Sequence, residues 1–146
     1  MIRFPDTPPI HTFRYTLRSR YSETDKMGYV YYARYLEYFE VARTEMIRNL
    51  GLPYGEMEKQ GIMLPVVDAE LTYKAPVLYD EEIHVDVMVF EKPMVRLETF
   101  YKVFTNRNET PHVLGRVTLC FTSTETRKPV RAPEEFLMRM EKSIKK

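Results

Sequence analysis

The sequence predicts an α+β fold in which an antiparallel sheet of about five strands is wrapped around one long central helix. Apolar residues recur every three or four positions between residues 32 and 50, which indicates a helix with one buried face. Apolar and polar residues alternate in one segment before this helix and in four segments after it, which indicates strands. So long an apolar stripe needs a whole sheet to cover it, and links of hairpin length favour antiparallel pairing as a meander.

The composition predicts a single domain, residues 1–146, able to bury about two thirds of its unfolded surface. A net charge of +1 argues against a nucleic-acid-binding face. No apolar run approaches the roughly 18 to 20 residues of a membrane span, and the N-terminus has no signal-peptide core. The single Cys120 fits a reducing compartment, so we expect a cytoplasmic protein that binds neither nucleic acid nor membrane.

The segments before the helix are an arm, a strand and a turn. Residues 1–11 are expected to form the arm, because three prolines in nine positions cannot sustain a helix or donate ladder hydrogen bonds. A half-buried strand follows from Thr12, with Phe13, Tyr15 and Leu17 on one side. The polar segment after Tyr21 then predicts a turn at Gly28.

The buried stripe of the long helix defines its extent. Its members are Tyr32, Tyr35, Leu36, Phe39, Ala42, Met46, Ile47 and Leu50. Gly51 followed by Pro53 predicts the end of the helix. A short helical turn is expected over Tyr54–Gln60.

Four strands are predicted after the helix: Leu64–Lys74, Glu82–Glu91, Val95–Asn106 and Val113–Thr122. In the first, Val67, Ala69, Leu71 and Tyr73 share one face. The polar or proline-containing links are 75–80, 92–93 and 106–112. Apolar residues at helical spacing predict a C-terminal helix over 133–146, and its terminal lysines suit a helix C-terminus.

Several kinds of site are disfavoured by their missing patterns. His11, His84 and His112 are far apart and show none of the spacings of a zinc site, so no metal is expected. No nucleophile elbow, P-loop or dinucleotide fingerprint occurs. Cys120 lies within a predicted strand, where a buried inert thiol is the expectation.

Asp25 is the residue that these exclusions leave. On the residues alone we favour a turn or helix-capping aspartate that accepts backbone N–H bonds near Gly28. The alternative is a catalytic carboxylate placed just ahead of a helix. Glu23 reads as a surface charge on the same grounds.

The segment from Tyr21 to Glu45, Y-x-E-T-D-x-M-G-x-V-Y-Y-x-x-Y-L-x-Y-F-E-x-A-R-T-E, resembles the signature of hotdog-fold acyl-CoA thioesterases. It is most similar to the 4-hydroxybenzoyl-CoA thioesterase family, which includes the Tol–Pal-associated thioesterases. The resemblance extends through Met63–Val67 and the turn Tyr73–Pro76 and covers residues 12–135. It implies a hotdog fold, a sheet wrapped around one helix, which agrees with the order of the predicted elements.

The resemblance also implies a site. Asp25 matches the family's catalytic carboxylate, a nucleophile or general base, and Tyr32 stands where many relatives have histidine and others tyrosine. Amides at the helix start around Val30 to Tyr32 are expected to stabilise the oxyanion, with Gly28 and Tyr31 beside the substrate. The candidates for the coenzyme A phosphates are Lys74, Lys92 and Arg96, each of which also reads as a solvated surface charge.

The implied activity is hydrolysis of an acyl-CoA thioester by a homodimer or homotetramer whose sites lie between subunits. Coenzyme A is part of the substrate, so no cofactor is expected. One alternative is a non-catalytic hotdog module that binds acyl-CoA or a protein partner. A second is an acyl-thioester dehydratase, which the absence of histidine between Asp25 and Leu50 disfavours.

Overall fold

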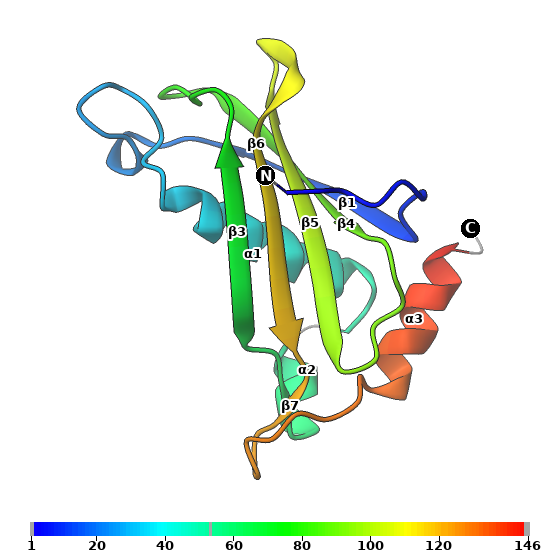
Figure 1. Cartoon of the computed structure of the whole chain (residues 1–146). Helices are drawn as coiled ribbons and strands as arrows, with labels where there is room; N and C mark the ends of the chain where they lie inside the picture. Colours follow the sequence, from blue (N-terminus) through cyan, green and yellow to red (C-terminus); the bar gives the residue numbers. More distant parts are fainter. Residues whose placement is uncertain (1, 53, 145–146) are drawn as a thin grey trace.

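A five-stranded antiparallel sheet forms the centre of the molecule (Figure 1). The structure is a computed structural model that describes residues 2–52 and 54–144. The strands in spatial order are β1 (His11–Arg18), β4 (Glu82–Val89), β5 (Arg96–Thr105), β6 (Asn108–Cys120) and β3 (Val66–Tyr73). The short strands β2 (Ile62–Met63) and β7 (Thr122–Ser123) pair separately. The predicted α+β architecture is confirmed.

The predicted meander holds for β4, β5 and β6 and is wrong for β3. This strand pairs with β6, from Val66 opposite Leu119 to Tyr73 opposite Val113, while β4 pairs with β1. Residues 74–81 therefore cross from one edge of the sheet towards the other. The expected link 106–112 is also wrong in part, because β6 already begins at Asn108, where the polar residues of the strand remain exposed.

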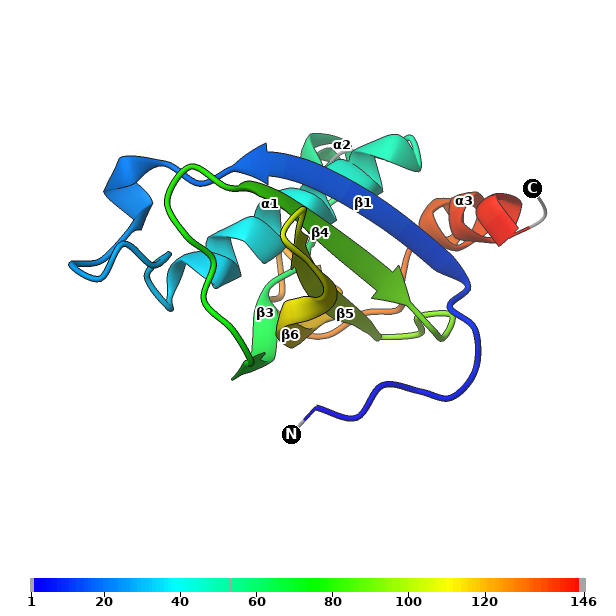
Figure 2. The same ribbon diagram turned by 90° about the horizontal axis from the view of Figure 1, so that it is seen from above.

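One long helix, α1 (Arg34–Asn49), lies across one face of the sheet, and α2 (Tyr54–Lys59) lies on the same side (Figure 2). The predicted stripe is correct for Tyr35, Phe39, Ala42, Met46 and Ile47, all buried. It is wrong for Tyr32, which is 61% exposed because the helix begins only at Arg34, and for Leu36, which lies within the first turn of the helix and is 41% exposed. Gly51 adopts a φ of 91° just beyond the helix, as a helix-terminating glycine does, and Pro53 lies outside the described residues.

The helix packs directly against the sheet at Gly115, where Phe39 of α1 lies over the glycine. The ring of Phe39 stacks on that of Tyr101, with centroids 4.2 Å apart, and Tyr101 is paired with Gly115 across β5 and β6. A Cβ atom added to Gly115 would lie 2.3 Å from Cε2 of Phe39. The absent side chain thus provides the space that the Phe39 ring occupies at the centre of the core.

The N-terminal arm crosses the face of the sheet opposite α1 (Figure 2). Residues 2–10 belong to no helix or strand, as expected, and Ile2 and Phe4 pack against Met88, Phe100 and Leu114. At the other terminus, α3 (Glu134–Ile144) buries Phe136 and Met140, which confirms a C-terminal helix up to residue 144; residues 145–146 lie outside the described residues. Among the described helices, none is both long and apolar enough to cross a bilayer.

Candidate active site

Asp25 lies in a tight turn between the 3-10 helix η1 (Tyr21–Glu23) and the start of α1. Its Oδ1 accepts hydrogen bonds from the N–H groups of Met27 (2.8 Å) and Tyr29 (3.2 Å). Gly28 has a φ of 78°, a conformation that favours glycine, which explains the residue at this position. The turn role that the residues alone predicted for Asp25 is present. Its Oδ2 has no hydrogen-bond partner among the described residues.

Glu23 is buried beneath this turn's backbone contacts, and the expectation that it is a surface charge is wrong. The residue is 5% exposed, and its Oε1 accepts hydrogen bonds from the Arg20 N–H (2.8 Å) and the Tyr38 hydroxyl (3.1 Å). Burial, followed by the charge of Glu23 and the hydrogen bond to it, raises the pKa of Tyr38, which keeps the phenol protonated as a donor. The Glu23 carbonyl also accepts the Tyr31 N–H at 2.8 Å.

A second segment, residues 77–79, pairs with the turn from the side. The Val30 N–H donates to the Val77 carbonyl at 2.8 Å, and the Tyr79 N–H donates to the Gly28 carbonyl at 3.0 Å. Tyr29 and Leu78 form an antiparallel bridge between these two contacts. The Asp25 turn is therefore held by a segment about fifty residues further along the chain, on the crossing from β3 to β4.

A pocket of about 410 Å³ opens beside Asp25. The other residues that line it are mostly aromatic or apolar: Met27, Tyr29, Val30, Tyr32, Tyr35, Tyr73, Lys74, Ala75 and Pro76. The Tyr73 hydroxyl donates to the Tyr32 carbonyl at 2.9 Å, which ties the end of β3 to the start of α1. Burial raises the pKa of Tyr35 to about 12, so this phenol is neutral in the wall of the pocket.

The predicted oxyanion donors at Val30 and Tyr31 are wrong. Both N–H groups are already bonded, to the carbonyls of Val77 and Glu23, because these residues precede the helix and pair with neighbouring segments. The helix begins at Arg34, whose N–H donates to the Tyr31 carbonyl at 2.9 Å. Within the described residues, the N–H groups of Tyr32 and Ala33 have no hydrogen-bond partner. These two amides are the donors that the start of α1 offers.

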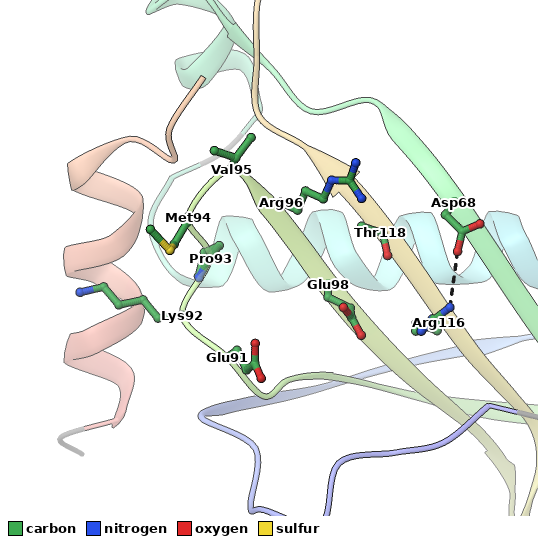
Figure 3. Close-up of a pocket in the computed structure, with 10 residues that line it drawn as sticks. All are labelled: Asp68, Glu91, Lys92, Pro93, Met94, Val95, Arg96, Glu98, Arg116 and Thr118. Carbon is green, nitrogen blue, oxygen red and sulfur yellow. Dashed lines mark ion pairs between the residues drawn. The ribbon is translucent and has the colours of Figure 1, made fainter. Parts of the chain in front are cut away.

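The three cations predicted to hold phosphates do not lie together. Lys74 lines the pocket of Asp25, whereas Lys92 and Arg96 line a different pocket at the other end of the sheet (Figure 3). Arg96 is paired with Cys120 and Tyr73 with Val113, a separation of seven residues along β6, or roughly 23 Å. Lys92 forms an ion pair with Glu141, and Glu91 and Glu98 line the same pocket. Of these three cations, Lys74 alone lines a pocket with Asp25 within one chain.

Sequence reasoning missed most of the aromatic wall. Tyr73 and Pro76 belong to the Tyr73–Pro76 turn that supported the resemblance, yet only Lys74 was singled out from it. Tyr35 was expected as a core residue; it is buried, and it also lines the pocket. The missing information was the crossing of residues 74–81, since only that path brings the end of β3 beside the Asp25 turn. In the described part of the chain, no three His, Cys, Asp or Glu side chains gather as a metal site.

The model of the Thioesterase-like superfamily matches residues 19–140 of the chain. The Bacillus subtilis protein YneP is 47% identical to this chain over 72 residues, which are 49% of this chain and 52% of the length of YneP. Its name carries a provisional assignment as an acyl-CoA thioesterase. The chain thus spans about half the length of this relative.

Two solved structures are similar to this chain in both fold and sequence. A DHNA-CoA thioesterase from Staphylococcus aureus is 37% identical with a TM-score of 0.77, covering 82% of this chain and 80% of that one. A hypothetical protein from Aquifex aeolicus is 30% identical with a TM-score of 0.81, covering 88% and 98%. The chain therefore belongs to the Thioesterase-like superfamily, and its sheet around one long helix is the hotdog fold that the Tyr21–Glu45 signature implied.

Proposed function

We propose that the protein is an acyl-CoA thioesterase, which hydrolyses an acyl-CoA thioester to a carboxylic acid and coenzyme A. The observation that carries the proposal is the meeting of Asp25 and Tyr32, at the start of α1, in one pocket with aromatic walls. The pocket thus combines a carboxylate with the start of α1, where the amides of Tyr32 and Ala33 have no hydrogen-bond partner among the described residues, and these are the two groups that thioester hydrolysis needs. The Staphylococcus aureus relative, a DHNA-CoA thioesterase 37% identical to this chain, supports this reaction class.

The geometry of Asp25 suits either of two roles in the reaction. The two N–H bonds to Oδ1 fix the orientation of the carboxylate and leave Oδ2 for the reacting partner. As general base, Oδ2 takes a proton from water while the water oxygen bonds to the thioester carbon and the thiolate leaves. As nucleophile, Oδ2 itself bonds to that carbon, the C–S bond breaks and the coenzyme A thiolate leaves, and water then hydrolyses the resulting anhydride to the carboxylic acid and free Asp25.

The oxyanion formed on the thioester carbonyl needs donors placed ahead of the reaction. We assign this role to the amides of Tyr32 and Ala33, because amides at a helix start point outward and carry partial positive charge. Tyr32, exposed at the mouth of the pocket, is placed to orient the substrate through its ring. The tyrosine-rich walls favour a flat aromatic acyl group, since aromatic rings gain from edge and stacked contacts.

We further propose that the protein is a dimer joined along β3. The strand is an edge, and its apolar face is not covered within one chain: Val67 is 51% and Tyr73 49% exposed. By contrast, the exposed residues of the other edge strand, β1, are the polar Thr12, Arg14, Thr16 and Arg18. An exposed apolar edge is a template for pairing with a second copy. In that assembly Lys74 remains the phosphate candidate beside Asp25, and Lys92 and Arg96 reach a site only through another subunit.

The test is a comparison of wild type with Asp25→Asn on a panel of aliphatic and aromatic acyl-CoAs, with free thiol as the readout. Asparagine keeps an oxygen to accept the Met27 and Tyr29 N–H groups, so the turn is preserved while the basic oxygen is lost. We expect a loss of about a hundredfold or more in kcat, typical of removing a catalytic base. Asp6→Asn, in the exposed N-terminal arm, is the matched control and should retain full activity.

Two outcomes contradict parts of the proposal. Equal rates for wild type and Asp25→Asn would show that Asp25 has no catalytic role. If the wild type releases no thiol from any substrate, but binds acyl-CoA, the protein is the non-catalytic binding module considered above.

A further inference from the structure

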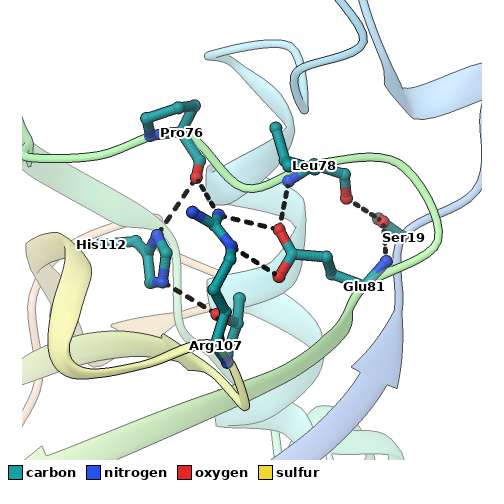
Figure 4. A network of polar contacts seen from close by, with 7 residues as sticks. Ser19, Pro76, Leu78, Glu81, Arg107 and His112 are labelled. Atoms are coloured by element: carbon teal, nitrogen blue, oxygen red, sulfur yellow. Dashed lines mark hydrogen bonds and ion pairs between the residues drawn. The ribbon is translucent and has the colours of Figure 1, made fainter.

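The crossing segment 76–79 is held to the sheet by a network of polar contacts from Ser19, Glu81, Arg107 and His112 (Figure 4). Glu81 accepts the Leu78 N–H at 2.8 Å and also receives two bonds from Arg107, from Nη2 at 2.9 Å and from Nε at 3.3 Å. The same Nη2 donates to the Pro76 carbonyl at 3.0 Å. Arg107 thereby joins the two ends of the segment, because it bonds both the carboxylate that holds Leu78 and the carbonyl of Pro76.

His112 holds the beginning of the same segment. Its carbonyl accepts the N–H groups of Lys74 (2.8 Å) and Ala75 (3.1 Å), and its Nδ1 lies 3.1 Å from the Pro76 carbonyl. A carbonyl oxygen only accepts, so Nδ1 carries the proton. In the neutral ring Nε2 is then the acceptor for the Thr105 hydroxyl, 2.9 Å away. The imidazole is buried and fixed between these two partners.

Ser19 completes the network at the far end. Its hydroxyl donates to the Leu78 carbonyl at 2.8 Å and accepts the Glu81 N–H at 3.2 Å. Leu78 is thus bonded through both its N–H and its carbonyl. Pro76 and Leu78 are thus held by the network. Val77 and Tyr79 of the same segment bond in turn to Val30 and Gly28 of the Asp25 turn.

We propose that Glu81, Arg107 and His112 are positioning residues that set the place of the Asp25 carboxylate through the segment 76–79. None of them lines the pocket of Asp25, so they act only through this segment. The path is continuous: from Arg107 to Pro76 and Glu81, from Glu81 to Leu78, and from Val77 and Tyr79 to the turn that carries Asp25. A displaced segment would lose the bonds to Val30 and Gly28 and would let the turn move.

The consequence for catalysis follows from the distances that a reacting carboxylate tolerates. A displacement of about 1 Å in a reacting group lowers the rate by up to about a hundredfold. The inference therefore deepens the proposed function and rests on it for its kinetic part. Its structural part, the hold on the Asp25 turn, is independent of any activity.

The chain offers a closely matched control for Arg107. Arg14 makes a bidentate bond to Asp86 on the outer face of the same sheet, with Nε at 2.6 Å and Nη2 at 2.9 Å. The side chains of that pair are 51% and 18% exposed, against 47% and 17% for Arg107 and Glu81. Among the described residues, Arg14 has no hydrogen bond or ion pair to segment 76–79, so Arg14→Ala removes a similar ion pair without releasing the segment.

The experiment compares Arg107→Ala, Arg107→Lys and Arg14→Ala by amide hydrogen exchange and by steady-state kinetics. In Arg107→Ala we expect exchange at the amides of Val30 and Tyr79 to accelerate about tenfold or more, since a charged bond that secures the segment is lost. We expect kcat to fall about ten- to a hundredfold with a smaller change in KM. Arg107→Lys, which keeps a cation but bonds only one partner, should recover part of both effects. Arg14→Ala should leave both unchanged.

Equal exchange at Val30 and Tyr79 in Arg107→Ala and Arg14→Ala would overturn the inference. If the wild type hydrolyses no thioester, the proposed function fails on its own, and the exchange comparison still decides whether the network holds the turn. Should Arg107→Ala not fold, Glu81→Gln takes its place, because it removes the charge that pairs with Arg107 and keeps the shape of the side chain. Faster exchange at Val30 and Tyr79 in that variant supports the inference, and unchanged exchange overturns it.

Discussion

The contact between α1 and the sheet predicts a large effect from the smallest substitution in the core, Gly115→Ala. The new Cβ would lie 2.3 Å from Cε2 and 2.5 Å from Cζ of Phe39, a ring that is fully buried and stacked on Tyr101. Overpacking of this kind costs about 1–3 kcal/mol. Restricting the unfolded chain by replacing glycine returns about 0.4–1 kcal/mol. We therefore expect a net loss of about 1–2 kcal/mol, or about 3–8 °C in Tm.

Urea unfolding followed by circular dichroism measures this loss, with Gly55→Ala as the matched control. Gly55 lies in α2 with open space around it and no positive φ, so alanine there should leave stability unchanged or raise it slightly. Phe39→Leu removes the two ring atoms that clash, so Gly115→Ala added to Phe39→Leu should cost much less than it does alone. A Gly115→Ala protein as stable as the wild type would refute the described packing of Phe39 of α1 against Gly115.

Two further predictions concern assembly and pH. Val67→Lys places a charge on the exposed β3 edge and should convert the proposed dimer to a monomer, measured by light scattering. Met138→Lys, at a similarly exposed position of α3, is the control and should not change the mass. A Val67→Lys protein that is still a dimer would contradict pairing along β3. For pH, burial favours a higher pKa of Glu81, but the hydrogen bonds from Arg107 and from the Leu78 N–H outweigh it and lower the pKa below its usual 4.5. A lowered carboxyl pKa stabilises the fold above the unfolded value, and this stability is lost as the pH falls through the folded value. The stability difference between wild type and Arg107→Ala in urea should thus be full at neutral pH and shrink below about pH 4.5, and a constant difference would exclude Glu81 as the partner.

The periodic patterns predicted those elements whose environment is uniform along their length. The alternation of Ile83, Val85, Val87 and Val89 was predicted and all four are buried, because β4 has a neighbouring strand on both sides and α1 above it. The order of the strands was not predictable in the same way. An alternating segment shows which face is apolar, but not which strand lies beside it, so β3 was placed next to β4 instead of next to β6.

The helix start shows why the site was only partly predictable. Tyr32 fits the spacing of the apolar stripe, but spacing does not reveal that the two residues before it, Val30 and Tyr31, are still paired with Val77 and Glu23. The amides of Val30 and Tyr31 are consumed by those partners, which come from other parts of the chain. The turn at Asp25 and Gly28 was predictable because the bonds from Met27 and Tyr29 to Asp25 and the positive φ of Gly28 are local, whereas the bonds from Val77 and Tyr79 that hold the turn come from a distant segment and could not be predicted.

The bond from Tyr73 to the Tyr32 carbonyl has a consequence for how activity depends on protein concentration. Tyr73 is the last residue of the edge strand β3, and it also closes one side of the pocket that contains Asp25. Any partner that pairs with this edge also steadies the side chain that secures the start of α1. In the proposed dimer, subunit association and turnover both depend on the Tyr73 phenol, so dilution below the dimer dissociation constant is expected to lower the specific activity of every site.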